Sequence, residues 1–140
     1  IIHFATHGFV NEDRPNLSGL ILAQNGDTED NILFASEIYN LSLNADLVAL
    51  SACQTGLGTV SEGEGLIGLS RGFMYAGAKN LLVSLWPVSD EGTSTLMVDF
   101  FSESNKTGNS ASLHRSKLDL IAKPDLASPF YWAPFILIGK

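Results

Sequence analysis

The chain has 140 residues, of which 45% are hydrophobic and 16% are charged. This length and balance are typical of one globular domain with a real core, and they exclude a disordered chain. Fifteen acidic residues outweigh eight basic ones and give a net charge of −7. Nucleic-acid binding normally needs a basic patch, so we expect no direct binding to DNA or RNA. No apolar run approaches the roughly 20 residues that cross a bilayer, so we expect no membrane partner either.

The cysteine content points to a reducing compartment. Cys53 is the only cysteine, which makes an internal disulfide impossible, and no signal-peptide pattern opens the chain. We therefore expect a cytoplasmic protein. No cysteine and histidine cluster has the spacing of zinc ligands, so we expect neither a metal nor another cofactor.

The first predicted elements are short strands separated by polar turns. Residues 1–6 read as an apolar strand, and a loop of turn formers follows at 11–16. Two apolar runs, 19–23 and 32–34, flank the Asn25-Gly26 pair. Asn-Gly is the strongest local hairpin signal, so we expect a small antiparallel hairpin beside the main sheet.

The middle of the chain alternates strand and helix patterns. A short helix is expected at 35–39, followed by a continuous apolar run at 47–52 that is typical of a strand buried on both faces. Apolar residues recur at helical spacing over 64–76, and Gly77 is well placed as a left-handed cap at the helix end.

The last third continues the alternation. A strand at 80–86 stops at a proline, and Ser89 and Asp90 can cap the following helix. A further helix is expected near 111–121 and a last strand at 131–138, where a proline favours an edge or a bulge. Strands alternating with helices predict an α/β fold with a mainly parallel sheet.

The most informative residues follow two of these strands. Cys53 ends the apolar run at 47–52, and His7 ends the first strand. The carboxyl ends of parallel strands meet in the crevice where open α/β sheets place their chemistry. A thiol with a pKa of about 8.5 needs a base or a positive charge to react at neutral pH, and His7 can supply the base. The pattern therefore predicts a cysteine nucleophile with a histidine base.

Several separate motifs carry a resemblance to a known family. Ala52-Cys53-Gln54 lies 46 residues after His7, and caspases place the catalytic histidine about 50 residues before a similar signature. The segments involved are 2–8, 17–23, 50–56, 63–65, 84–88 and 131–133. Together they resemble the CHAT domain family, which comprises caspase- and separase-like bacterial modules often found downstream of helical repeats. The resemblance runs over nearly the whole chain.

The resemblance implies a fold and an activity. The fold would be a caspase-like three-layer sandwich with a mainly parallel sheet, helices on both faces and a small β-hairpin. The activity would be that of a cysteine endopeptidase acting on a protein substrate, with the amides of Gly8 and Cys53 as the oxyanion hole. The absence of a Cβ on Gly8 lets its amide approach a reacting carbonyl. A helical-repeat domain, TPR-like, would be an upstream or separate partner.

The start of the chain also carries an expectation. Ile1 opens directly on strand-like sequence without an initiator Met, and CHAT domains similar to this one have further elements before the histidine strand. We therefore expect residues 1–140 to be the C-terminal portion of a larger protein, with the N-terminal part of the domain missing. An exposed sheet edge or apolar face should mark where that part docks.

Each candidate residue also has a simpler interpretation. A lone cysteine is usually a small buried hydrophobe, and only the motif context favours Cys53 as a nucleophile. His3 lies on the same strand face as His7 and is a rival base, although we expect it to pack in the core with one hydrogen-bonded nitrogen.

Two acidic residues are candidates for substrate binding. Separases carry a Trp-Asp-Val-Thr-Asp segment linked to arginine recognition, and Asp90 lies in the similar segment here, with Pro87 in place of the first acid. Asp90 would then bind a basic side chain, or else serve as a helix N-cap. Glu64, with Glu62, lies after the cysteine and is a second candidate, although loop charges are commonly just solvated.

The sequence also has two alternative interpretations. Residues 63–68 match the G-x-G-x-x-G dinucleotide pattern, with Asp90 at a suitable distance, but about ten residues separate them from the preceding strand and Glu64 would repel a pyrophosphate. The second alternative, from a different class, is a catalytically silent CHAT-type interaction module that docks on helical repeats.

Overall fold

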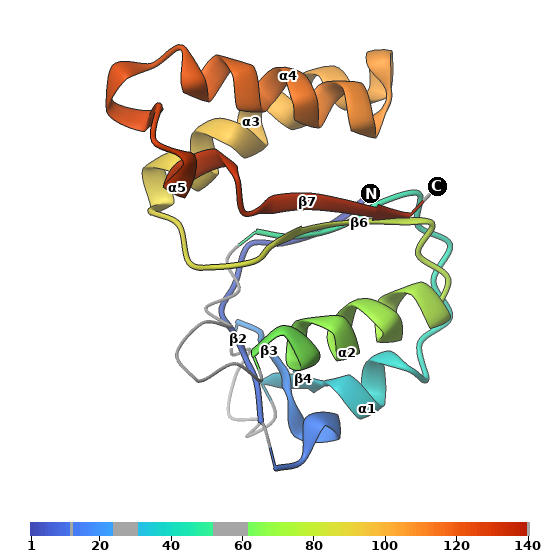
Figure 1. The fold of residues 1–140 in the computed structure, drawn as a ribbon. Coiled ribbons are helices and arrows are strands. Elements are labelled where there is room, and N and C mark those ends of the chain that lie inside the picture. Colours follow the sequence, from blue (N-terminus) through green and yellow to red (C-terminus); the bar gives the residue numbers. More distant parts are fainter. Residues whose placement is uncertain (12, 24–30, 52–61, 140) are drawn as a thin grey trace.

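The computed structural model describes residues 1–11, 13–23, 31–51 and 62–139, with the backbone alone for 62–67. Its centre is a four-stranded sheet in the order β1-β5-β6-β7 (Figure 1). These strands span Ile2–Phe4, Val48–Leu50, Asn80–Ser84 and Phe135–Gly139. The first three are parallel and β7 runs antiparallel to β6, so the sheet is mainly parallel, as predicted.

A second, smaller sheet lies beside the first. It contains β2 (Gly8–Phe9), β3 (Gly19–Ile21) and β4 (Ile32–Phe34), all antiparallel. The predicted hairpin is confirmed as β3 and β4, whereas its Asn25-Gly26 turn lies outside the described residues. β2 was not predicted. The first strand ends at Phe4, and the chain bends before Gly8–Phe9 pairs with β3.

Helices cover both faces of the main sheet, which completes the predicted three-layer α/β arrangement (Figure 1). On one face lie α1 (Ala35–Ile38) and α2 (Glu62–Tyr75). On the other lie α3 (Asp90–Thr107), α4 (Asn109–Ile121) and the short α5 (Pro129–Trp132). Short 3-10 turns occur at Pro15–Leu17 and Pro124–Leu126. None of the described helices combines the length and the apolar character that a bilayer crossing needs.

Two cores flank the main sheet because successive strand residues point to opposite faces. In β5, Val48 and Leu50 face α2 and pack with Phe73, whereas Ala49 faces the opposite core with Phe100. All of these side chains are completely buried. Burial on both faces explains why residues 47–52 read as an unbroken apolar run.

The end of α2 follows the predicted capping. Gly77 has a φ of +110°, and an added Cβ would lie 2.1 Å from the carbonyl oxygen of Leu43. The Ala78 amide donates to the Phe73 carbonyl and the Gly77 amide to the Met74 carbonyl, which is the Schellman pattern. This cap turns the chain directly into β6.

The last predicted strand was partly wrong. Residues 129–132 form α5 rather than strand, because Ser128 caps them and Pro129 suits the first helical position. The strand proper begins after Pro134 and forms an edge of the sheet, as the proline indicated.

Candidate active site

The strands that carry the proposed dyad are parallel neighbours. β1 pairs with β5 in register from Ile2 opposite Val48 to Phe4 opposite Leu50, and the Ser51 amide donates to the Phe4 carbonyl. The carboxyl ends of these two strands therefore lie side by side. Cys53 itself lies outside the described residues, and Ser51 is the last described residue before it.

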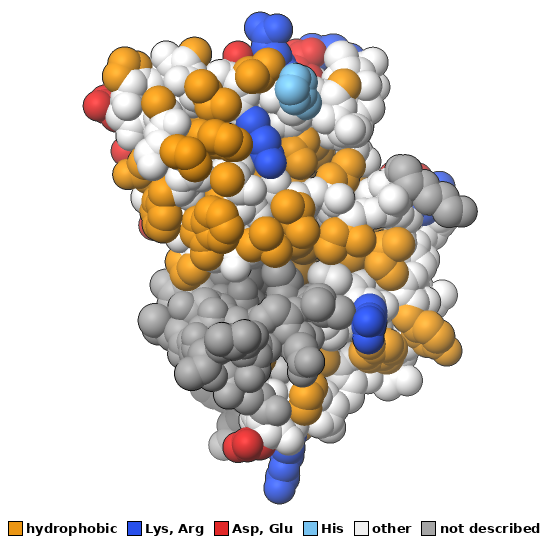
Figure 2. Space-filling view, in the orientation of Figure 1, with side chains coloured by type: hydrophobic (Ala, Val, Ile, Leu, Met, Phe, Trp, Pro, Cys, Tyr) orange, Lys and Arg blue, Asp and Glu red, His pale blue; other side chains and the backbone are white. Residues whose placement is uncertain are grey.

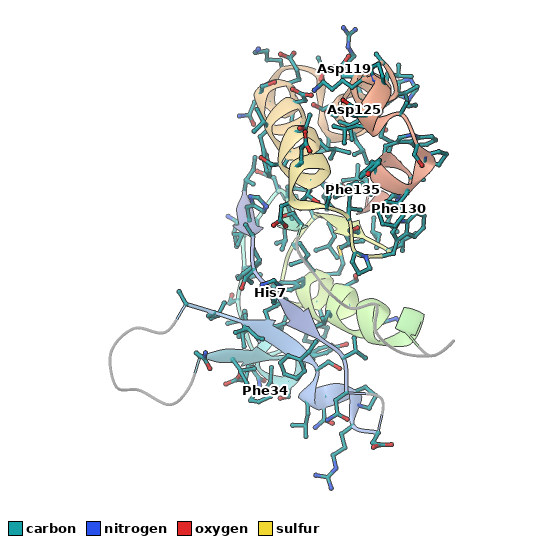
Figure 3. The ribbon with its side chains drawn as sticks, turned by 90° about the vertical axis from the view of Figure 1, so that its left-hand side faces the viewer. His7, Phe34, Asp119, Asp125, Phe130 and Phe135 are labelled. Carbon is teal, nitrogen blue, oxygen red and sulfur yellow. The ribbon has the colours of Figure 1, made fainter. Side chains whose placement is uncertain are left out.

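His7 lies where the chain passes from the main sheet to the small one (Figure 3). Its side chain is exposed. Its backbone is fixed by the small sheet, because its carbonyl accepts a bond of 2.8 Å from the Ile21 amide, and the hydroxyl of Thr6 donates to the Ile21 carbonyl. The imidazole thus extends from an anchored backbone at the junction of the two sheets.

Gly8 presents its amide away from the small sheet. In an antiparallel pair, alternate residues bond to the neighbouring strand. Since the carbonyl of His7 bonds to β3, the amide of Gly8, which is opposite Leu20, points to the open side of β2. Gly8 is also buried. A buried amide that points away from β3 is the type of donor that an oxyanion hole needs.

His3 differs from its expected core position. Its Nε2 lies 2.7 Å from the Oγ of Ser51, so one nitrogen is hydrogen-bonded as predicted. However, the residue lies on an edge strand and its side chain is exposed on one side, while its ring packs at 5.1 Å from that of Phe101. Partial burial lowers the pKa of His3 below its usual 6.5. The contact with Ser51 therefore ties β1 to the residue that follows β5.

The predicted neighbour of the cysteine strand is also where expected. β6 pairs in parallel with β5, so the loop after β6 starts at the same edge of the sheet. The N-cap of α3 is Ser89, whose Oγ accepts from the Gly92 amide at 3.2 Å. Asp90 is not the N-cap but the first helical residue, and its carboxylate is exposed and available to a ligand.

The remaining acidic candidates lie at the start of α2. Glu62 is its first residue and Glu64 lies in its first turn, while the side chains of both lie outside the described part of the chain. The dinucleotide interpretation is contradicted here, because 63–68 lie within the helix rather than in a turn between a strand and a helix.

One feature of this edge was missed by sequence reasoning. The indole Nε1 of Trp86 donates to the Phe130 carbonyl at 3.1 Å, and the Leu85 amide donates to the Pro134 carbonyl. These bonds hold the loop after β6 against α5. Leu85 and Phe130 remain 47% and 50% exposed, so apolar side chains are exposed both after β6 and on α5. The signal was present in the motifs 84–88 and 131–133, but 131–133 were interpreted as strand.

Metal binding has no support in the described part of the chain, where no group of three or more His, Cys, Asp or Glu side chains is placed to hold an ion.

Comparisons with known proteins agree with the fold. The model of the CHAT domain family matches residues 1–140. Tetratricopeptide repeat protein 28 of Mus musculus is 36% identical over 110 residues, and its Homo sapiens counterpart is 34% identical over 110 residues. The match covers 78% of this chain but only 4% of each of those proteins.

Proposed function

This chain belongs to the CHAT domain family, and we propose that it is a cysteine endopeptidase of the caspase and separase type. The observation that supports this most directly is the parallel pairing of β1 with β5. It brings the end of the His7 strand beside the end of the strand that leads to Cys53.

The proposed reaction uses the dyad in two steps. His7 takes the proton of the Cys53 thiol, and the thiolate attacks the carbonyl carbon of a peptide bond. The resulting oxyanion accepts hydrogen bonds from the amides of Gly8 and Cys53. His7 then gives its proton to the leaving amine, which leaves an acyl-enzyme, and a water molecule activated by the same imidazole hydrolyses the thioester.

Substrate recognition would use the loop after β6. The exposed carboxylate of Asp90 suits a basic side chain through a bidentate contact, and Glu64 is a second acidic candidate. Leu85 and Phe130 add exposed apolar side chains, after β6 and on α5. The proposed substrate is therefore a protein segment with a basic residue next to an apolar one.

The test is labelling of Cys53 by a thiol-reactive electrophile attached to a basic peptide. We expect His7→Ala to slow labelling by about 100-fold or more, because general-base catalysis is worth about that much. His114→Ala is the matched control, since His114 is exposed on α4, and it should not change the rate. Cleavage of a protein substrate should stop in Cys53→Ala; undiminished cleavage there would refute the proposal.

A second candidate function is a proteolytically silent module that docks on helical repeats. The names of the relatives favour it, because both are tetratricopeptide repeat proteins. A silent module would react with the electrophile no faster than free cysteine does, and His7→Ala would leave that rate unchanged. In either case, a helical-repeat domain is the proposed partner.

A further inference from the structure

Among the described strands, β7 forms an edge of the main sheet, next to β6. The Leu85 amide donates to the Pro134 carbonyl, which fixes the alternation of hydrogen bonds between β6 and β7. Ile136 and Ile138 therefore bond to β6, whereas Leu137 and Gly139 direct their amides and carbonyls outward; Phe135 has the same orientation but is completely buried. Edge strands of soluble proteins are usually protected by charges, proline or a covering segment. Phe135–Gly139 carries no charge and no proline.

An apolar band runs across this face of the molecule. Figure 2 shows hydrophobic side chains gathered over β7, between the two helical layers, with acidic side chains toward the margins of the view. Ile136 and Leu137 are partly exposed and Ile138 is 36% exposed. Contiguous exposed apolar surface of this kind typically marks an interaction site.

A pocket opens beside the strand. It has a volume of about 580 Å³ and is lined by Ser70, Arg71, Met74, Tyr75 and Ile138. Tyr75 is 77% exposed, whereas Ser70 is only 5% exposed. The Oγ of Ser70 makes no hydrogen bond to any described residue. Met74, Tyr75 and Ile138 are exposed, so the pocket offers apolar side chains beside the strand.

The charged residues around the band indicate the chemistry of the partner that would bind there. Arg71 is exposed at the pocket, and Lys117 belongs to α4, the helix that packs against β7 from the other side. Burial lowers the pKa of Lys117 below its usual 10.5. On α4 the acidic Asp119 is paired with Arg115 and lines the groove toward α3. In a chain with a net charge of −7, this edge is therefore apolar with basic flanks.

We propose that β7 is a docking strand for an extended peptide segment of a partner protein, which adds a strand to the sheet. The outward amides and carbonyls would supply its main-chain bonds, and pockets beside the strand would supply specificity. One apolar side chain would occupy the pocket by Met74 and Tyr75, and an acidic side chain would pair with Arg71. A second copy paired through its own β7 would bring the same basic flanks together, so it complements this edge less well.

This docking strand is separate from the proposed active site. Ile138 is opposite Leu81 near the start of β6, whereas the dyad belongs to the carboxyl ends of the parallel strands. The proposal therefore extends beyond peptidase activity and does not depend on it. Cys53→Ala should abolish cleavage and leave peptide binding unchanged, so the failure of one proposal is distinguishable from the failure of the other.

The experiment selects short peptides from a random display library on the purified full chain and measures their binding by fluorescence anisotropy. We expect the selected peptides to combine aliphatic or aromatic residues with Asp or Glu. Arg71→Glu should weaken binding about tenfold, since it turns an attractive pair into a repulsive one. Arg115→Glu is the matched control and should leave binding unchanged. Tyr75→Ala is a second test of the same pocket, because a side chain this exposed contributes little to folding.

Hydrogen exchange then locates the bound peptide. The amides of Leu137 and Gly139 should exchange rapidly in the free protein and slowly in the complex, whereas those of Ile136 and Ile138 should be slow in both. Failure to select any binding peptide would overturn the proposal, as would peptides that leave these two amides unprotected. Sedimentation that shows a dimer with the same amides protected in the absence of peptide would identify a second copy as the occupant instead, and would also overturn it.

Discussion

The hydrogen bond between His3 and Ser51 joins the ends of the two strands that carry the proposed dyad, and a double-mutant cycle measures its strength. His3→Phe removes the nitrogen that lies 2.7 Å from the Ser51 hydroxyl while keeping an aromatic ring against Phe101. Ser51→Ala removes the other partner. The cycle compares both single variants with the double variant.

The structure predicts unequal costs for the two single changes. Ser51 is only 6% exposed, so His3→Phe leaves a buried hydroxyl without this partner, at a cost of about 1–3 kcal/mol. Ser51→Ala leaves a ring nitrogen on an exposed side chain, which water can reach, so we expect a cost of about 1 kcal/mol or less. The double variant should lose less than the sum of the two, by about 1 kcal/mol, which is the net worth of such a bond.

Urea unfolding followed by fluorescence provides the free energies, provided that the slope with denaturant stays constant among the variants. A second cycle that pairs Ser51→Ala with His114→Phe is the control, because His114 is exposed on α4 and its effect should be additive. A coupling below about 0.3 kcal/mol for His3 and Ser51, within the range of distant pairs, would refute the proposed link.

Other predictions concern stability. Stability should fall as the pH is lowered through about 6.5, because the lowered pKa of His3 lets the unfolded chain bind a proton before the folded one. The urea midpoint should fall less over this pH range in His3→Gln than in the unchanged protein. Gly77→Ala should lower the free energy of unfolding by about 1–3 kcal/mol, since φ is +110° and the new Cβ would lie 2.1 Å from a carbonyl oxygen. Gly108 has a φ of +85° but open space around it, so Gly108→Ala should lower stability less when both variants are compared by thermal unfolding. Ser112→Ala should cost about 1 kcal/mol, because a buried hydroxyl donates to a carbonyl at 2.8 Å, whereas the exposed Ser102→Ala should stay within about 0.5 kcal/mol by urea titration.

Local signals were sufficient for most of the fold. The apolar run at 47–52 predicted a strand buried on both faces, and β5 is completely buried. Gly77 predicted the end of α2, because a left-handed cap is encoded by one residue. The strand neighbours of β5 followed from the general rules for parallel α/β sheets.

The misses arose where tertiary pairing decided the outcome. β2 has two residues, too few for a periodic pattern, and it forms only because β3 is there to pair with. Residues 129–132 contain aromatic residues that favour strands, yet Ser128 and Pro129 start a helical turn there. His3 was expected in the core, but no described strand covers the outer side of β1, and this consequence of an exposed sheet edge was not drawn for His3.

The position of His7 depends on both sheets at once. On one side, β1 is held to β5 by its ladder and by the contact between His3 and Ser51. On the other, the carbonyl of His7 is held to the Ile21 amide of the small sheet. The backbone of His7 is therefore held by bonds within both sheets, which fix where its side chain starts relative to the end of β5. Since a displacement of about 1 Å can cost 100-fold in rate, a bond worth only about 1 kcal/mol to folding can matter more to the proposed reaction than to stability.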